Sequence, residues 1–403
     1  MTFSKETFDL ARKADTALSE VYAKIDDISL HNTAKVMEAF KNNRVSESHF
    51  IASTGYGYDD AGRAVTERVF AEAFGTESAL VRQCIVNGTH ALTVGLFGLL
   101  RPGDTLLSVT GKPYDTLEEV IGLSGQSGVG SLKDFGVNYK QCEIGENFSD
   151  LLDSKVKVVY LQRSRGYGQR PALSPSEITE ITRFVHANSN AYVVVDNCYG
   201  EFTCKEEPEA DLLIGSLIKN PGGGIALTGG YLAGTKEAVE LASYRLTSPG
   251  VGGEVGATLG QNRNMLLGFW LAPHAVAQAM KTAAFSAYVF ENAGFEVSPS
   301  FNEARYDLIQ TVTLHDPEKL KAFIQAIQYS SPVDSYVTPE PWAMPGYTDE
   351  VIMAAGTFTG GSTIELSADA PMRPPYTAFL QGSLTFEGGK LSILNALEAV
   401  TRK

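Results

Sequence analysis

The fold of this chain is decided by the stretch Gly-Ser-Leu-Ile-Lys-Asn-Pro-Gly-Gly-Gly, residues 215–224. Lys219 stands here between an apolar segment and a glycine-rich one, whereas lysine is usually an exposed residue. Burial would lower the pKa of this amine and favour the neutral, nucleophilic form that condenses with an aldehyde. Ser216 precedes the lysine by three residues and is placed to donate a hydrogen bond to a phosphate. A surface lysine before a turn is the weaker interpretation of this pattern.

Around this stretch, short apolar runs alternate with amphipathic helical patterns. The runs predicted to form strands are residues 79–86, 104–109, 156–161, 191–196, 211–216 and 229–234. Helices are predicted over residues 90–100 and 175–187. Strands that alternate with helices in this way indicate an α/β fold with a mainly parallel, doubly wound sheet.

Two of these strands are followed by polar residues, at the edge where open α/β sheets bind ligands. Asn87-Gly88-Thr89 comes after a run that ends at Val86 and before a helix, whose free N–H groups and dipole suit a phosphate. Asp196 closes an apolar strand, where an unpaired acid is unfavourable to bury. An ordinary glycine-containing turn stays open for the first feature. A helix N-cap or a structural ion pair stays open for the second.

The pattern divides the chain into three parts. Apolar residues at helical spacing predict an N-terminal helical arm over residues 1–50, which packs on the body of the chain or on a partner subunit. The α/β pattern occupies residues 51–265 and forms a large ligand-binding domain. A long helix to about residue 293 and later segments predict a smaller α+β domain over residues 266–403. Those later segments are residues 308–314, 317–328, 351–355 and 384–400.

Composition and charge exclude several classes of protein. The 403 residues carry a net charge of −14 at pH 7, which argues against the basic patches that nucleic acids and anionic membranes require. No apolar run is long enough to span a bilayer, and the first residues lack the features of a signal peptide, so we expect a cytoplasmic protein. The four cysteines and six histidines form neither CxxC nor HExxH, so no metal site is expected.

The order of phosphate turn, aspartate and lysine is that of pyridoxal 5'-phosphate (PLP) enzymes of the aminotransferase-like fold, fold type I. Specific segments are Gly-Tyr-Gly-Tyr-Asp-Asp-Ala-Gly-Arg (55–63), Gly-Lys-Pro-Tyr-Asp-Thr (111–116), Val-Asp-Asn-Cys-Tyr-Gly-Glu-Phe (195–202) and the stretch 215–224. Over essentially the whole chain, the sequence resembles bacterial cystathionine β-lyase-like or methionine γ-lyase-like "aluminium resistance" proteins. The resemblance implies a PLP-dependent carbon–sulphur lyase. Its substrate would be a sulphur-containing amino acid such as cystathionine, cysteine or methionine, cleaved by β- or γ-elimination.

The resemblance also implies which residues hold the cofactor. Lys219 would bind it covalently and Asp196 would face its pyridine nitrogen. Tyr114 would lie against the face of its ring. The phosphate would be held by Asn87, Gly88, Thr89 and Ser216.

One residue is expected to act in a second subunit. Tyr58 resembles a tyrosine that members of the wider family send into the neighbouring active site, where it contacts the phosphate and helps the leaving group depart. The resemblance therefore implies a homodimer or homotetramer with active sites at the subunit interface.

Three positions depart from the pattern of the wider family. Asp60 stands where that pattern has an arginine two residues after the tyrosine, and Ile218 stands where a second hydroxyl donor is common. The C-terminal strand that supplies an arginine for the substrate carboxylate has Gln381 and no arginine. Arg373 is therefore the nearest candidate for that carboxylate, and Arg165 could reach either the substrate or the phenolic oxygen of the cofactor.

Other functions remain open at this point. The same lysine and aspartate would serve a PLP aminotransferase or a lyase acting on a carbon–carbon or carbon–oxygen bond, because the cofactor supplies the difficult chemistry. A PLP-binding protein that has lost turnover would fit the missing C-terminal arginine. A nicotinamide-binding Rossmann protein is excluded, because glycines 222–224 and 229–230 do not form G-x-G-x-x-G after a first strand, and no P-loop is present.

Overall fold

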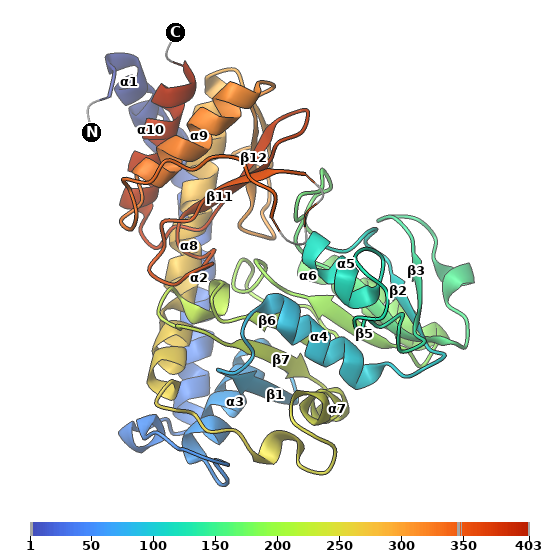
Figure 1. Ribbon diagram of the computed structural model, residues 1–403. Coiled ribbons are helices and arrows are strands. Elements are labelled where there is room, and N and C mark those ends of the chain that lie inside the picture. Colours follow the sequence, from blue (N-terminus) through green and yellow to red (C-terminus); the bar gives the residue numbers. More distant parts are fainter. Residues whose placement is uncertain (1–2, 345–346, 348, 402–403) are drawn as a thin grey trace.

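A computed structural model describes residues 3–344, 347 and 349–401 of the chain, which form two sheets with helices around them (Figure 1). The larger sheet contains seven strands of the described residues. In spatial order these are β1 (Ser78–Arg82), β7 (Gly230–Gly234), β6 (Leu212–Ser216), β5 (Tyr192–Asp196), β4 (Val156–Gln162), β2 (Thr105–Ser108) and β3 (Asn138–Gln141). Strand β7 runs antiparallel to both of its neighbours, and the other pairs are parallel. The sheet is mainly parallel and doubly wound, as the sequence predicts.

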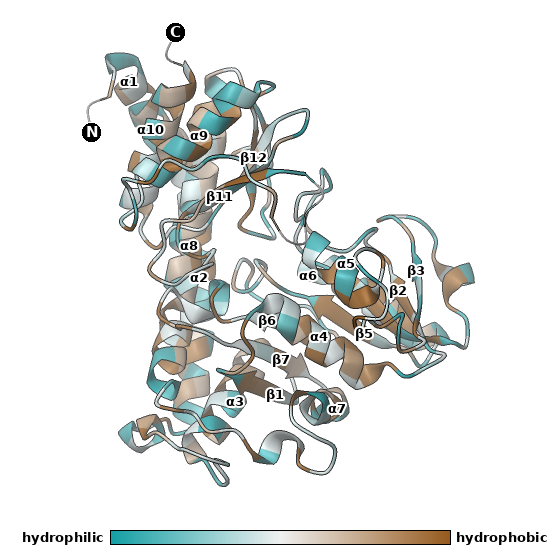
Figure 2. Ribbon diagram, viewed as in Figure 1, coloured by the Kyte–Doolittle hydropathy of each residue, from teal (hydrophilic) through white to brown (hydrophobic). Residues whose placement is uncertain are grey.

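Helices cover both faces of this sheet because its central strands are apolar on both sides. Val194 and Leu212 face α4 (Gly88–Leu99), α5 (Asp115–Ile121) and α7 (Lys236–Leu246). Val193 and Leu213 face α2 (Ser19–Asn42), α3 (Ala61–Phe74), α6 (Pro175–Asn188) and α8 (Asn262–Asn292). Figure 2 shows the apolar colouring concentrated on these inner strands and on α4, with polar residues on the outer helical surfaces.

The second sheet is smaller and antiparallel. Its order is β10 (Val351–Ala354), β11 (Ser367–Pro371), β12 (Thr377–Gln381), β9 (Gln310–Thr313) and β8 (Glu296–Ser298). Its apolar face packs on α1 (Lys5–Ala17), α9 (Pro317–Tyr329), α10 (Phe386–Thr401) and the last turns of α8. This unit is the smaller α+β part that the sequence predicts.

One long helix connects the two sheets. Helix α8 buries Phe269 and Val276 in the core of the larger sheet, and Phe285 and Phe290 in the core of the smaller one. Helix α2 packs along it (Figure 1). Since α1 and α2 bury their apolar residues against these same two cores, the N-terminal arm uses the body of its own chain. The domain boundary that we propose after residue 265 falls within the first turn of α8.

The local differences from the predicted elements have physical reasons. Strand β1 ends at Arg82 instead of Val86, because its partner β7 begins at Gly230, opposite Arg82. Strand β3 was not expected, since an edge strand with the sequence Asn-Tyr-Lys-Gln has no apolar pattern. Among the described residues, no helix is both long and apolar enough to cross a bilayer.

Candidate active site

The predicted cofactor residues meet at the carboxyl edge of the larger sheet. Strand β6 ends at Ser216, and Lys219 follows it directly before the short helix η3 (Asn220–Gly222). A methyl group placed on Gly88 would lie 3.7 Å from Ser216 Cβ and 3.9 Å from Lys219 Nζ. It would also lie 3.2 Å from the Sγ atom of Cys198. The glycine turn, the serine and the lysine, which are far apart in sequence, therefore border one small space.

The turn before α4 has the geometry of an anion site. Asn87 is the N-cap of this helix, and its Oδ1 accepts a hydrogen bond from the backbone N–H of His90 at 2.8 Å. Gly88 and Thr89 are the first helical residues, whose N–H groups have no carbonyl partner within the helix. The hydroxyl of Thr89 shares a hydrogen bond of 2.8 Å with Thr116. The side chain of Asn87 thus stabilises the turn, and the backbone of the next two residues faces outward as donors.

Lys219 is half-buried in the site, and its charge state differs from the expectation. Burial is the largest influence on this amine and lowers its pKa, yet Cys198, Tyr199 and Asp196 together outweigh it and hold the pKa above the ordinary value. The Nζ atom lies 4.1 Å from the centre of the Tyr199 ring, an arrangement that stabilises an ammonium group. The expectation of a lowered pKa was therefore wrong for the protein without its cofactor. The neighbours responsible come from the loop after β5 and not from the stretch around the lysine.

Asp196 lies at the end of β5 with 8% of its surface exposed. Its Oδ1 accepts a hydrogen bond from the backbone N–H of Cys198 at 3.1 Å. Burial raises the pKa of this carboxyl, and the charge of Lys219 acts in the opposite direction. Neither open alternative for this residue is what the structure shows, since Asp196 is not a helix N-cap and no cation of the described residues lies within ion-pair distance of it. A buried carboxylate without an ion pair is suited to a cationic ligand atom.

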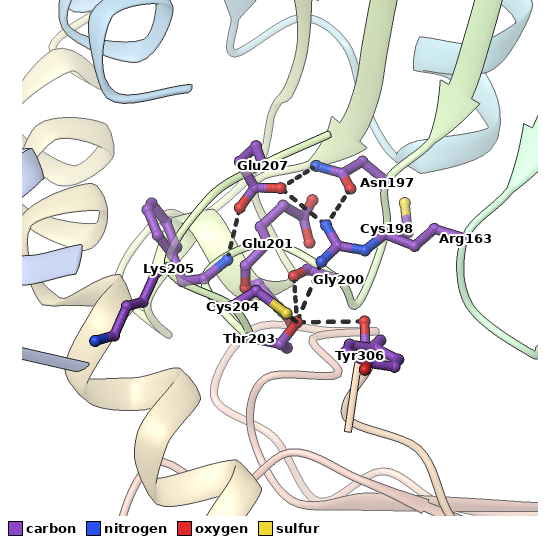
Figure 3. A network of polar contacts seen from close by, with 12 residues as sticks. Arg163, Asn197, Cys198, Gly200, Glu201, Thr203, Cys204, Lys205, Glu207 and Tyr306 are labelled. Carbon is purple, nitrogen blue, oxygen red and sulfur yellow. Dashed lines mark hydrogen bonds and ion pairs between the residues drawn. The ribbon is translucent and has the colours of Figure 1, made fainter. Parts of the chain in front are cut away.

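A network of polar contacts holds the loop that follows Asp196 (Figure 3). Arg163, which is fully buried, donates to Asn197 Oδ1 at 2.7 Å and to Glu207 Oε2 at 2.8 Å. Asn197 also donates to Glu207, at 3.1 Å, and to the hydroxyl of Tyr231, at 3.2 Å. The pair of Arg163 and Glu207 thus ties the end of β4 to both ends of the 197–207 loop, which carries Cys198 and Tyr199 toward the lysine.

Glu201 is a second buried acid, and its charge acts on Lys219. Its Oε1 accepts a hydrogen bond of 2.8 Å from the Tyr231 hydroxyl, while its Oε2 has no partner among the described residues. Burial is the main reason that its pKa rises to about 8, and the charge of Glu207 adds to the rise. At neutral pH this carboxyl is therefore mostly protonated.

Tyr114 and both predicted substrate arginines border one cavity of about 580 Å³. Its lining includes Gln162, which is paired with Asp196 in the sheet, so the cavity adjoins the end of β5. Arg165 is buried, with Nη1 donating to Ser298 Oγ at 2.9 Å and Nε without a partner among the described residues. Arg373 forms an ion pair of 2.7 Å with Asp349, and half of its side chain is exposed. Its position at the cavity fits the expected role, but its guanidinium is already neutralised.

Tyr58 is 59% exposed and stacks on Tyr56 with ring centres 5.6 Å apart. The neighbouring charged residues have structural partners. Asp60 caps α3 by accepting from the N–H of Arg63 at 2.7 Å, and Arg63 donates to backbone carbonyls, including Gly256 O at 2.8 Å. Tyr58 is thus an exposed side chain of this segment, and its action in a second subunit stays a prediction.

Sequence reasoning missed three residues of this region. Cys198 and Tyr199 come two and three residues after Asp196, and Tyr199 has the uncommon φ of +72° for a residue with a side chain. Asp369, on β11, acts electrostatically on the tyrosines of the site and on Lys219. The motif around Asp196 could have indicated the first two, whereas Asp369 lies in a strand without any motif.

The assembled residues fit PLP. Because residue 88 is a glycine, the space next to it is not filled by a side chain; a methyl group at this position would occupy part of it. The hydroxyl of Ser216 and outward-facing backbone N–H groups border this space, as a phosphate requires. The half-buried amine of Lys219 lies next to it, and the buried carboxylate of Asp196 acts on that amine. Among the described residues, no group of three or more histidine, cysteine or acidic side chains is arranged to hold a metal ion.

Comparison with known proteins identifies the family of this chain. Residues 7–401 match the methionine γ-lyase family. The uncharacterised protein YnbB of Bacillus subtilis is 49% identical over 98% of this chain and 96% of its own length. A carbon–sulphur lyase involved in aluminium resistance from Clostridium novyi has a crystal structure that is 48% identical, with a TM-score of 0.94, over 99% of this chain and 97% of that one.

Further structures extend the comparison. A protein from Clostridium acetobutylicum, proposed to be a cystathionine β-lyase involved in aluminium resistance, is 46% identical with a TM-score of 0.96, over 99% of this chain and 96% of that one. The methionine γ-lyase CalE6 of Micromonospora echinospora is 15% identical with a TM-score of 0.57, which shows a shared fold. The chain therefore has the fold type I architecture of PLP-dependent enzymes and belongs to the methionine γ-lyase family.

Proposed function

We propose that this protein is a PLP-dependent carbon–sulphur lyase that acts on a sulphur-containing amino acid by β- or γ-elimination. The observation that supports this most is the meeting of Lys219 Nζ, Ser216 and the Gly88 turn around one space. The family match supports the class of reaction. Cystathionine, cysteine and methionine are the candidate substrates.

Each residue has a distinct part in holding the cofactor. The backbone N–H groups of Gly88 and Thr89 and the hydroxyl of Ser216 would bind the phosphate, and Asp196 would hold the proton on the pyridine nitrogen. Tyr114 would lie against the ring. When bound, PLP supplies an electron sink that makes the α-proton of an amino acid acidic.

The chain itself has to move protons and bind the substrate. Lys219 Nζ is the base that would take the proton from the α-carbon, and for γ-elimination also a proton from the β-carbon. Arg165 lines the cavity with an unpartnered Nε and is our candidate for the α-carboxylate of the substrate. Arg373 at the same cavity stays a second candidate.

The cofactor assignment is tested by absorbance. Purified protein mixed with PLP should show the visible band of a lysine-bound cofactor, and Lys219→Ala should lack that band and lose about 10²-fold or more in activity. A band that is absent from the wild type, or unchanged in Lys219→Ala, would contradict the assignment.

Product analysis tests the reaction. A lyase releases a thiol, an oxo acid and ammonia from cystathionine or cysteine without a second substrate. A PLP aminotransferase forms the oxo acid only when an amino acceptor is supplied. A PLP-binding protein without turnover releases no product and does not exchange the α-proton of any amino acid in deuterated water.

A further inference from the structure

The smaller sheet presents a carboxylate to the active site. Asp369 on β11 lies directly opposite Phe379 on β12, so both side chains are on the same face of the sheet. The Phe379 ring packs on Tyr167, with centres 4.9 Å apart, and Tyr167 lines the cavity beside the cofactor residues. Asp369 is only partly buried. Its face of the sheet is therefore the one turned toward the active site.

The partners of Asp369 leave its charge unpaired. Gln381 donates its Nε2 to Asp369 Oδ2 at 3.0 Å. No lysine, arginine or histidine in the described part of the chain lies within ion-pair distance of the Asp369 carboxylate, and Arg373 is taken by Asp349. The Asp369 carboxylate therefore has an amide as its hydrogen-bond partner and is available to a cationic ligand group.

Three tyrosines lie close enough to this carboxylate for its charge to act on their hydroxyls. Tyr114, Tyr167 and Tyr347 form a cluster in which the ring centres lie 5.7, 6.0 and 6.4 Å apart. The hydroxyls of Tyr114 and Tyr347 are 2.9 Å apart. The negative charge of Asp369 contributes to raising the pKa of all three hydroxyls, after burial, so the rings stay neutral at physiological pH. Neutral aromatic faces beside a carboxylate attract a cation.

We propose that Asp369, with this tyrosine cluster, binds an ammonium group on the sulphur substituent of the substrate. The substrate class is then an amino acid whose departing thiol carries an amine, which includes cystathionine and excludes methionine and cysteine. This inference rests on the proposed lyase function and specifies its substrate. Asp369 is a specificity-determining residue in this proposal, and it takes no part in the proton transfers.

A pair of isosteric probes tests this proposal. S-(2-aminoethyl)-L-cysteine and S-propyl-L-cysteine differ only in a terminal ammonium or methyl group. With water, a lyase converts the first into cysteamine, pyruvate and ammonia, breaking the bond between Cβ and sulphur. For the PLP-loaded protein, two quantities are measured with each probe: the concentration that half-saturates the change in cofactor absorbance, and kcat/KM for thiol release.

The wild type should bind the aminoethyl probe about tenfold more tightly than the propyl probe, as expected for a charge-assisted contact. Asp369→Asn should bring this ratio close to one. Asp115→Asn is the control, since the carboxylate of Asp115 lines the cavity that Tyr114, Tyr167 and Tyr347 also border, and this variant should keep the ratio. Equal half-saturation by both probes in the wild type, or a ratio that survives in Asp369→Asn or is lost in Asp115→Asn, would overturn the proposal.

A pH series on the wild type covers the case in which Asp369→Asn does not fold. The pKa of Asp369 is raised to about 6, mainly by burial, and Gln381, Lys219 and Tyr167 partly counter this. The ratio should therefore decline from pH 7 to pH 5 as the carboxyl gains a proton, because the four surrounding tyrosines, Tyr114, Tyr167, Tyr199 and Tyr347, do not titrate there. A ratio that is constant over this range contradicts the role of Asp369.

The two proposals fail in different ways. If both probes shift the cofactor spectrum with the expected ratio and no thiol appears, the lyase function is wrong and the ammonium site stands. If thiol is released from both probes with equal efficiency, the lyase function stands and the ammonium site is wrong.

Discussion

At the residue scale, the absence of a side chain at Gly88 keeps open the space in which we propose that the phosphate binds. A methyl group there would come 3.2 Å from Cys198 Sγ and would enter the space beside Ser216. Gly88→Ala should therefore weaken PLP binding by about tenfold or more, since overpacking typically costs about 1–3 kcal/mol. The melting temperature should change little, because alanine is favourable in a helix.

The dissociation constant of PLP, measured by titrating the cofactor-free protein, checks this expectation. Gly360→Ala is the control, because a methyl group at Gly360 would meet nothing within 4 Å. If the two variants bind PLP equally well, the Gly88 turn does not hold the phosphate.

At the scale of elements, the buried pair of Arg163 and Glu207 joins the end of β4 to the loop after β5. Glu207→Gln should lower the free energy of unfolding by about 3–5 kcal/mol, because it leaves a buried guanidinium without its counter-charge. Glu209→Gln removes the partner of Arg183 in a pair whose side chains are more than 60% exposed, and it should cost less than about 1 kcal/mol. Urea unfolding of the two variants checks the difference, and equal losses would mean that the network is not a structural tie.

The sequence predicts those elements whose burial leaves a pattern. Strands β4, β5 and β6 are buried on both faces and are read directly from runs such as Val193–Val195. Strand β3 and strand β11 have no such run. Strand β3 is polar at the edge of its sheet, and β11 has the sequence Ser-Ala-Asp-Ala-Pro, which does not favour a strand. Strand β3 forms because it pairs with β2, and strand β11 forms because it pairs with β12. Such pairings arise only in the tertiary structure, so the sequence pattern of the two strands does not indicate them.

The site could be predicted where its residues share a motif. Ser216 and Lys219 were found because they lie in one glycine-rich stretch, and the structure places both beside Gly88. The charge on Lys219 was not predictable, because it depends on Tyr199 and Cys198, which come from another loop. Asp369 was missed for the same reason, since only the folded chain brings β11 to the cofactor site.

At the scale of the whole molecule, one buried acid should make stability depend on pH. The pKa of Glu201 is about 8 in the folded chain against an ordinary value of 4.5, so the folded state holds a proton that the unfolded state has lost. Below pH 4.5 the carboxyl is protonated in both the folded and the unfolded state, and its contribution to the free energy of unfolding is fully present. As the pH rises from 4.5 to about 8 this contribution is lost, and the free energy of unfolding falls by up to about 1.4 kcal/mol per pH unit.

Glu201→Gln keeps the acceptor for the Tyr231 hydroxyl and removes the titration. The free energy of unfolding of the wild type should therefore fall relative to that of Glu201→Gln between pH 5 and pH 8, as measured by denaturant unfolding. A constant difference across this range would show that Glu201 titrates normally in the folded protein.

The exposed Tyr58 segment predicts an active site shared between two copies of the chain. Tyr58→Phe and Lys219→Ala should each lower activity by about 10²-fold or more. When the two variants are unfolded and refolded together, about a quarter of the sites should combine an intact Lys219 with an intact Tyr58 from the other chain. Recovery of activity above the sum of the separate variants checks this, and no recovery would place the action of Tyr58 elsewhere.

In these proposals the residues that hold the cofactor come from the larger sheet, and Asp369 comes from the smaller one. Each sheet has its own hydrophobic core, and helix α8 packs in both cores. Changes on β11 and β12 can therefore alter which substrate is accepted without disturbing the cofactor. The same separation suits engineering: exchanging the residues at positions 369 and 381 is the shortest route to an enzyme that prefers acidic or neutral thiols.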